Sequence, residues 1–428
     1  MSREFDVVLF GATGVTGVYV VEELHKTAKA EDPKLRWAVA GRSETKLKET
    51  LRAAARNLEL EEDALDNIPT IIADVEDQHS LDEMVKRTKI LLNTVGPYRF
   101  FGRPVVMACV QHGTHHLDVS GEPQYLEQMQ NEFFKDAEEK GIFVIGACGF
   151  DSIPAEMTVT YLRNNFKGEL GQVETFVAMN PGPKGMKINF GTWQSAIYGM
   201  AHASELIELR KESREKIFTK SLPPSETRLT RRNALFWSDI AKGWCLPFLG
   251  SDRSVLLHSE MFRYQLLGKR PAQIQTYLRV PSFLHGIGMI LLAAIFGIMS
   301  SFSFGRTLLE KFPEAFSFGM VRRGGPTREQ AVACSFTLVA RGKGWEERLA
   351  EASDKHTSPP EKTLVVSLDG PDPAYVTTAI CLVQAAMVIL KEKEKMLGKG
   401  GALSPGAALN ETSYLERLQK NGFKFQVL

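Results

Sequence analysis

The sequence predicts an α/β fold in which a doubly wound parallel sheet is followed by a second unit with a mixed sheet. Three observations support this prediction: strands alternate with helices over the first 150 residues, a glycine-rich turn joins the first strand to the first helix, and the pattern changes beyond Asp151. The length of 428 residues agrees with two units, because one hydrophobic core rarely grows beyond roughly 250–300 residues.

The N-terminal elements are predicted in a regular strand–helix order. The first strand, 5–10, is a short apolar run of the kind that a buried parallel strand requires. Further strands are expected at 36–40, 70–73, 90–94, 116–119 and 142–145, and helices at 18–29, 44–57, 80–87, 104–112 and 124–140. This alternation is typical of βαβ units and a parallel sheet that ends near residue 150.

The rest of the chain is less regular. Strands are expected at 173–179, 335–341 and 363–368, and the long insertions between them indicate a mixed sheet. Helices are expected at 205–220, which is rich in charge, and at 375–391 and 412–422.

One segment is unusually apolar. Residues 280–305, between Arg279 and Arg306, contain no Lys, Arg, Asp or Glu, and 286–302 is apolar nearly throughout. A helix of this length could reach across a bilayer's hydrocarbon, which is roughly 30 Å thick. Basic residues flank both ends, so a re-entrant hairpin or shallow insertion into one leaflet or a droplet monolayer is favoured over a true span. Burial in the core or in a dimer interface is the alternative.

Charge and cysteine content exclude several classes of protein. Lys and Arg number 52 and Asp and Glu 51, so no basic surface for nucleic acid is expected. The cysteines are odd in number and scattered, which disfavours disulfides and a zinc site and indicates a reducing compartment; they are Cys109, Cys148, Cys245, Cys334 and Cys381. No metal site and no signal peptide are expected, and an intracellular location is predicted.

The glycine-rich turn carries the clearest functional signal. Gly11, Gly14 and Gly17 form a G-x-x-G-x-x-G pattern where the first strand meets the first helix. Gly11 permits the tight turn, Gly14 lets backbone amides approach a pyrophosphate, and Gly17 allows the helix to pack closely on the strand. Backbone N–H groups at Thr13, Gly14, Val15 and Thr16 would then point at the anion. The pattern predicts dinucleotide binding.

The end of the second strand indicates which dinucleotide is bound. An NAD site places Asp or Glu there for the ribose 2′-hydroxyl, whereas this chain has Arg42 and Ser43, with Lys46 one turn further on. A guanidinium suits a 2′-phosphate, so NADP(H) is favoured over NAD(H). Further cofactor contacts are expected beyond later strands, at Asp74 and Val75 beside the adenine and at Gly96, Pro97 and Tyr98 beside the nicotinamide.

Several motifs together resemble the saccharopine dehydrogenase-like oxidoreductase family. Beyond the glycine-rich turn and Ala40–Ser43, the matching stretches are 95–98 (VGPY), 118–122 (DVSGE), 149–154 (GFDSIP), 191–196 (GTWQSA), 312–313 (FP), 324–327 (GGPT) and 404–408 (SPGAA). The match runs in order over essentially the whole length.

The resemblance implies an NADP(H)-binding Rossmann domain over 1–150. It also implies a second, α+β domain over 151–374, serving substrate binding or oligomerisation and including 280–305, and C-terminal helices over 375–428 that pack back on the first domain. It further implies association with lipid droplets, and related bacterial proteins include enoyl reductases that act on lipid precursors.

The matching motifs also contain the candidates for proton transfer: Tyr98, Asp118, Glu122, Asp151 and Ser152. Each has a structural alternative, because Asp151 and Ser152 could cap the helix that follows, Asp118 and Glu122 could hold a turn, and Tyr98 could stack near the cofactor. A saccharopine-like substrate would require several Arg or Lys side chains in the cleft, and the likely cleft motifs, 96–101, 118–122, 149–154 and 191–196, hold only Arg99.

The leading hypothesis is therefore an NADPH-dependent reductase of a small hydrophobic, lipid-like substrate, held through 280–305 at the cytosolic face of a membrane or a lipid droplet. An amino-acid-type dehydrogenase and a non-catalytic NADP(H)-binding scaffold of droplets are the alternatives. A homodimer is left open as a further partner.

Overall fold

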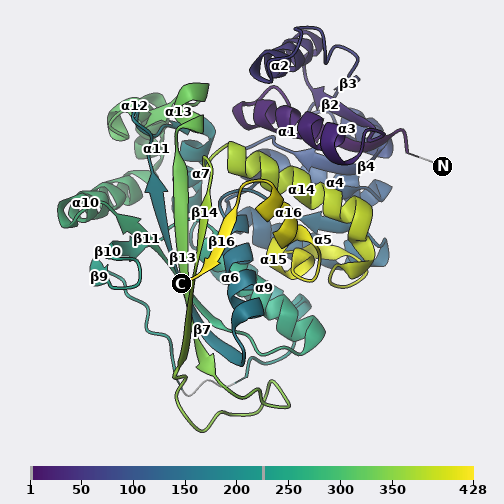
Figure 1. Cartoon of the computed structure of the whole chain (residues 1–428). Coiled ribbons are helices and arrows are strands. Elements are labelled where there is room, and N and C mark those ends of the chain that lie inside the picture. Colours follow the sequence, from purple (N-terminus) through teal and green to yellow (C-terminus); the bar gives the residue numbers. More distant parts are fainter. Residues whose placement is uncertain (1–2, 224–226) are drawn as a thin grey trace.

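The computed structural model describes residues 3–223 and 227–428 (Figure 1). Its first sheet has seven parallel strands in the order β15-β6-β5-β4-β1-β2-β3, which confirms the predicted doubly wound sheet. The strands are β1 (Phe5–Phe10), β2 (Trp37–Gly41), β3 (Thr70–Ile72), β4 (Thr88–Asn93), β5 (His115–Asp118), β6 (Phe143–Ile145) and β15 (Gly401–Leu403).

Helices connect these strands and cover both faces of the sheet. They are α1 (Val15–Glu31), α2 (Glu44–Asn57), α3 (Gln78–Lys86), α4 (Tyr98–His112) and α5 (Pro123–Glu139). The C-terminal helix α14 (Val376–Glu392), followed by a short 3-10 turn at Lys393–Lys395, packs on α1, where Gln384 Nε2 donates to Thr27 Oγ1 at 3.2 Å. The α14 helix is buried along almost its whole length because it packs against α1, α16 and the strands β4 and β5 of the first sheet (Figure 1).

The second sheet is mixed, as predicted, with the order β16-β14-β13-β7-β11-β10-β9. Only the β7–β11 pair is parallel among its described pairs. Its strands are β7 (Glu169–Asn180), β9 (Phe236–Ser238), β10 (Gly243–Pro247), β11 (Gln273–Val280), β13 (Ser335–Trp345), β14 (Lys362–Gly370) and β16 (Lys424–Val427). The helices α6 (Ile153–Asn165) and α9 (Asp252–Leu267) pack on this sheet. Of the remaining helices, α8 (Glu205–Lys216) packs on α5, α15 (Pro405–Leu409) on α6 and α9, and α16 (Tyr414–Lys420) on α14.

A smaller cluster of elements lies at the far end of the second sheet. Its centre is a core of Trp193, Ile197, Phe296, Leu309 and Val321. The elements are β8 (Ile188–Asn189), which pairs with β12 (Val321–Arg322), and the helices α7 (Phe190–Ala201), α10 (Phe283–Ser300), α11 (Ser303–Lys311), α12 (Pro313–Phe316) and α13 (Arg328–Val332).

The apolar segment forms the helix α10, which runs without interruption from Phe283 to Ser300. No hairpin turn falls inside it, so a re-entrant hairpin within this segment is not what the structure shows. Only 11% of its residues are buried, which also excludes a core helix of this chain. It is the one helix among the described residues that is long and apolar enough to cross a membrane.

Candidate functional site

The glycine-rich turn lies at the carboxyl edge of the first sheet. Gly11 has a φ of +88°, in the left-handed region that favours glycine, and its N–H donates to the Ala40 carbonyl at 3.0 Å. A Cβ at Gly11 would lie 2.8 Å from the Thr94 hydroxyl, because the ends of β1 and β4 meet there. Gly11 therefore lets the chain turn sharply between two neighbouring strands.

Gly14 and Gly17 shape the turn at the start of α1. A Cβ at Gly17 would lie 2.5 Å from the carbonyl oxygens of both Gly11 and Ala12, so only glycine permits this approach of helix and turn. Gly14 is the residue that precedes α1, and both Gly14 and Thr13 are exposed. The first amides of α1 are thus accessible to an anion, as a pyrophosphate site requires.

The residues that follow β2 fit a phosphorylated ribose. Ser43 begins α2, and its hydroxyl accepts the N–H of Lys46 at 3.4 Å. Arg42 is exposed, and within 3–223 and 227–428 its guanidinium has no hydrogen bond or ion pair. A free guanidinium and the absence of a carboxylate at this position suit a 2′-phosphate. At the end of β3, Asp74 and Val75 are half-buried.

Tyr98 is held inside the protein. It follows the cis Gly96–Pro97 peptide and is 6% exposed. Its hydroxyl donates to the Asn93 carbonyl at 2.9 Å and accepts the N–H of Val119 at 3.4 Å. Burial, and then the nearby Asp118 carboxylate, raise the pKa of Tyr98 well above its ordinary value. These contacts favour a positioning role, tying the ends of β4 and β5, over proton donation.

Glu122 joins three elements around the site. Its carboxylate accepts the backbone N–H groups of Tyr98 and Arg99, both at 2.9 Å, and so caps the start of α4. It also accepts the hydroxyl of Ser195, on α7, at 2.7 Å. With all these donors and an exposure of 5%, Glu122 fixes α7 against the first sheet.

Asp118 is almost completely buried. It is 1% exposed and accepts the N–H groups of Ser120 at 3.0 Å and Ala147 at 3.2 Å, and the Tyr125 hydroxyl at 2.8 Å. Burial raises its pKa to about 6 in spite of these donors. Its contacts connect the turns after β5 and β6.

The side chain of Asp151 lies next to a second carboxyl group, that of Asp252, which the sequence did not indicate as a site residue. Its side chain lies between Gly121 and Gly250, where an added Cβ on either glycine would come within 2.5 Å of its oxygens. It lies beside Asp252, at the start of α9, and burial raises the pKa of both groups, that of Asp151 to about 6. The Asp151 carboxylate raises the pKa of Asp252 further, so the protonation of each group depends on the other.

Ser152 is fully buried beside this pair. Its hydroxyl lies 3.1 Å from that of Ser251, and Ser251 in turn donates to the Asp151 carbonyl at 2.8 Å. Ser152 precedes α6 but its side chain makes no capping hydrogen bond. The Asp151 turn is thereby anchored to α9 in the second part of the chain.

A turn of the second part lies directly on the glycine-rich turn, which sequence reasoning missed. Gly325 has a φ of +74°, and a Cβ there would lie 2.8 Å from Val15. Next to it, Arg328 donates to Glu22 on α1 at 2.7 Å. The Gly324–Gly325 pair in the matching motifs was the available signal, but its partner is far away in sequence.

Arg99 does not present a free cation. Its guanidinium donates to both oxygens of Glu205, at 2.6 and 2.8 Å. A substrate carboxylate would have to displace this partner to bind there.

The sheet order, the open start of α1 and the free guanidinium after β2 together define an NAD(P)-dependent oxidoreductase of the doubly wound class. Comparison with known proteins agrees. Residues 7–145 match the family model described as the saccharopine dehydrogenase NADP binding domain. The cofactor is NADP(H), and the residues present fit it.

Relatives match over the full chain. A human saccharopine dehydrogenase-like oxidoreductase is 40% identical over 100% of this chain and 98% of its own length. A Caenorhabditis elegans protein named lipid droplet localized protein is 35% identical over 100% of this chain and 99% of its own. The chain belongs to the saccharopine dehydrogenase-like oxidoreductase family.

A solved structure shares the fold. Apo saccharopine dehydrogenase (L-Glu forming) from Saccharomyces cerevisiae superposes with a TM-score of 0.51, covering 99% of this chain and 100% of that one. At 13% identity this likeness shows the fold alone.

Proposed function

We propose that the protein is an NADPH-dependent reductase of a hydrophobic, lipid-like substrate and that it works on a membrane or lipid-droplet surface. The observation that carries the proposal is the exposed apolar face of α10 and its neighbours. The Caenorhabditis elegans relative is named for lipid droplets, which supports an intracellular location at such a surface. We further propose that the protein lies on the cytosolic side.

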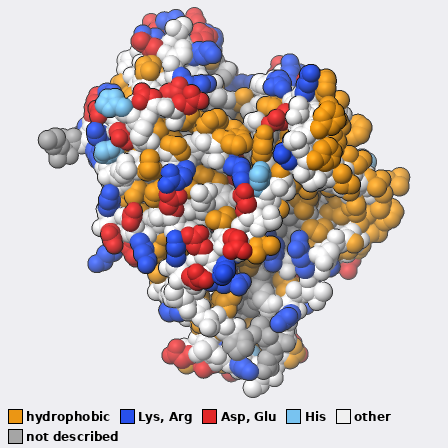
Figure 2. All heavy atoms as spheres, turned by 180° about the vertical axis from the view of Figure 1, so that it is seen from behind, with side chains coloured by type: hydrophobic (Ala, Val, Ile, Leu, Met, Phe, Trp, Pro, Cys, Tyr) orange, Lys and Arg blue, Asp and Glu red, His pale blue; other side chains and the backbone are white. Residues whose placement is uncertain are grey.

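The apolar face is large and continuous. Leu284, Leu291 and Ile298, spaced by seven residues on α10, are 78%, 59% and 66% exposed. Figure 2 shows hydrophobic side chains gathered over one end of the molecule, where α10 lies. Further exposed members are Phe283, Ile287, Met289, Ile290, Ile295, Phe302, Phe304, Phe312, Phe318 and Met320. A soluble monomer seldom leaves such an area in water, whereas a helix lying in a lipid interface requires it.

The α7 helix connects this face to the cofactor site. The Trp193 ring packs against Phe296 of α10 at a centroid distance of 4.7 Å, and Ser195, two residues later, donates to Glu122. One helix therefore touches both the apolar face and the turn that follows β5. We propose that a substrate dissolved in lipid reaches the nicotinamide site along α7.

The proposed reaction consumes NADPH and one proton and saturates a polarised C=C or C=O bond, which takes the hydride at carbon and the proton at the other atom. Four of the five candidates, Tyr98, Asp118, Glu122 and Ser152, are buried and held by the bonds described above. Asp151 is half-buried, and burial raises its pKa to about 6, beside Asp252, whose pKa is raised further. We assign proton donation to this pair of carboxyl groups, through Asp151, which is the more exposed of the two.

An amino-acid-type dehydrogenase is the competing proposal. Its substrate carries carboxylates that require Arg or Lys in the substrate site. Arg99 is paired with Glu205, so the geometry supports an uncharged substrate better.

A substrate-class comparison tests the proposal. The full chain is mixed with NADPH and either α,β-unsaturated acyl or ketone lipids in vesicles, or lysine with 2-oxoglutarate, and loss of NADPH absorbance is followed. Turnover with the lipids alone supports the proposal, and turnover with the amino-acid substrates alone would overturn it. Asp151→Asn should lower the lipid turnover by about 100-fold or more while NADPH affinity stays unchanged.

A further inference from the structure

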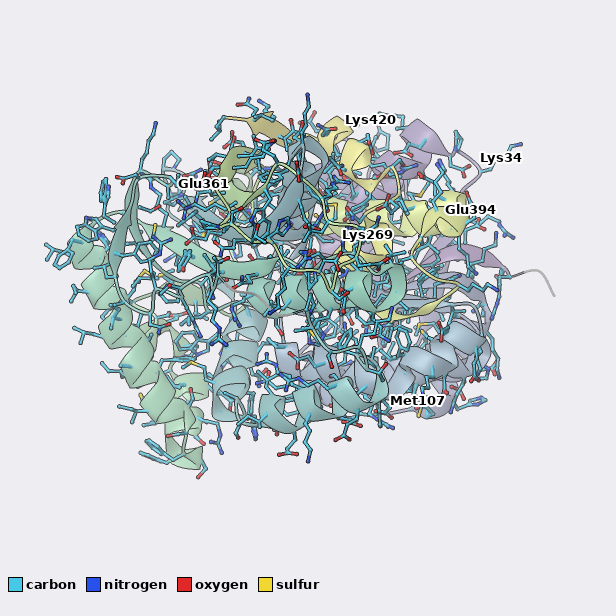
Figure 3. All side chains as sticks on the ribbon, turned by 90° about the horizontal axis from the view of Figure 1, so that it is seen from below. Lys34, Met107, Lys269, Glu361, Glu394 and Lys420 are labelled. Carbon is cyan, nitrogen blue, oxygen red and sulfur yellow. The ribbon has the colours of Figure 1, made fainter. Side chains whose placement is uncertain are left out.

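We propose that the second part of the chain holds a separate binding site for one anionic, single-chain lipid. The site is a cavity of about 810 Å³, within the range of roughly 300–1,000 Å³ that is typical of small-molecule pockets. It lies between α8, α9 and the loop that joins β13 to β14. Lys269, next to the lining residue Arg270, is labelled near the centre of Figure 3, which shows the molecule from below.

The cavity is separate from the cofactor site. Its described lining includes none of the residues of the glycine-rich turn or of the turns after β2, β4, β5 and β6. The proposed reductase activity leaves it without a role.

One side of the cavity is apolar. Leu229, Leu257, Met261 and Trp345 line it. The Trp345 ring stacks parallel on His356 at 3.8 Å, and its Nε1 donates to the Ser358 carbonyl at 2.8 Å. These bonds hold the indole as a flat wall, so an acyl chain could lie along it without displacing a polar contact.

Two other arginines that line the cavity already have carboxylate partners. The Arg270 side chain is 9% exposed and its Nε lies 3.2 Å from Glu169 Oε2, an oxygen that also contacts His356. The more exposed Arg210 donates to Glu127, with its Nη2 at 3.0 Å from Oε1. The charge of each of these two arginines is therefore compensated within the protein.

The charges at the rim are different. Arg214 and Arg228 line the cavity and are exposed, and across the described ranges neither makes a hydrogen bond or an ion pair. A carboxylate or phosphate would give these guanidinium groups partners through charge-assisted hydrogen bonds.

An apolar wall behind two free guanidinium groups matches a molecule with an anionic head and one acyl chain. A fatty acid and a lysophospholipid share this chemistry, with a carboxylate and a phosphate head. The geometry places the head at Arg214 and Arg228 and the chain along Trp345 and Met261.

Calorimetric titration of the full chain tests the site. The probes, below their micelle concentrations, are oleate, oleoyl lysophosphatidic acid, uncharged methyl oleate and inorganic phosphate. The test variant is Arg214→Ala/Arg228→Ala, whose side chains have no partners to lose. The matched control is Lys34→Ala/Lys211→Ala, which removes two exposed cations outside the lining. Met261→Trp fills the apolar end.

At least one of the two anionic lipids should bind wild type in a 1:1 ratio, and which one identifies the head group. Loss of both arginines should weaken it about tenfold or more, and the control should not. Met261→Trp should also weaken it, and NADPH binding should be the same in every variant. No saturable lipid binding, equal binding by the arginine variant, or phosphate alone binding as tightly would overturn the site. Because NADPH oxidation is not measured, failure here leaves the proposed reaction untouched.

Discussion

Arg42 is the residue on which cofactor choice depends. It is exposed and free at the end of β2, and the aspartate that an NAD site would carry is absent. Arg42→Asp should remove a partner of the 2′-phosphate and repel that group, so the ratio of NADPH to NADH affinity should fall by about tenfold or more. Fluorescence titration with both coenzymes measures the ratio.

The matched control for this charge reversal is Lys34→Asp, an exposed lysine before the opposite end of β2. It should leave the ratio unchanged. An unaltered ratio in Arg42→Asp would remove Arg42 from the site.

Glu156 couples stability to pH. It is 3% exposed, accepts the Ser259 hydroxyl, and burial raises its pKa from 4.5 to about 8. Between those values only the folded state keeps the proton, so folding loses stability as pH rises, by up to about 1.4 kcal/mol per pH unit. Below 4.5 both states are protonated, and above 8 both are ionised.

The isosteric Glu156→Gln has no such titration. In urea unfolding across this pH range, the free energy of unfolding of the variant should rise relative to that of wild type up to about pH 8 and then stay constant. Glu138→Gln, at an exposed position on α5, is the control and should show a constant difference. A constant difference for Glu156→Gln as well would contradict the assigned pKa.

At the scale of elements, α10 is predicted to hold the protein at lipid. Leu284→Asp/Leu291→Asp/Ile298→Asp changes only exposed positions, so the packing of Phe296 on Trp193 should survive. Flotation with triolein droplets or phospholipid vesicles should fall about 100-fold or more, since three apolar contacts are lost.

The control variant is Ile207→Asp/Val332→Asp/Val427→Asp, which makes three apolar-to-aspartate changes at exposed positions on other elements. This control should float as wild type does. If the α10 variant floats equally well, the lipid contact lies elsewhere or the face is covered by a second copy of the chain.

Regular elements were predictable from local sequence, and irregular ones were not. The α2 helix spans 44–57 as predicted, because its apolar positions recur on one face and Ser43 caps it. The strand β11 (QIQTYLRV) was not predicted, because its polar residues Gln273, Gln275 and Thr276 do not give the apolar pattern of a strand. It lies inside the sheet, between β7 and β10, and pairing with these neighbours rather than the local sequence pattern makes it a strand.

The residues of the candidate site also fall into those that local sequence reveals and those that it does not. The glycine-rich turn and Arg42 act through local backbone and could be found in the sequence. Asp252, Ser195 and Gly325 could not, because each becomes informative only when folding brings it to Asp151, Glu122 or Val15.

On the scale of the whole molecule, the C-terminal segment ties the two sheets together. The strand β15 extends the first sheet and β16 lies at the edge of the second, with the helices α15 and α16 between them in the chain (Figure 1). Arg417, on α16, donates to Glu31 on α1 at 2.7 Å. The cofactor turn and the apolar face are therefore parts of one framework, and the proposed function uses both together.

The most direct test compares turnover from a lipid phase with turnover in water. Wild type and the α10 triple variant are given NADPH and either a long-chain unsaturated lipid in vesicles or its short, water-soluble analogue, and kcat/KM is measured. The account predicts that wild type reduces both and that the variant loses the vesicle reaction while keeping the soluble one. Equal turnover of the vesicle substrate by the variant, or no turnover of either substrate by wild type, would contradict it.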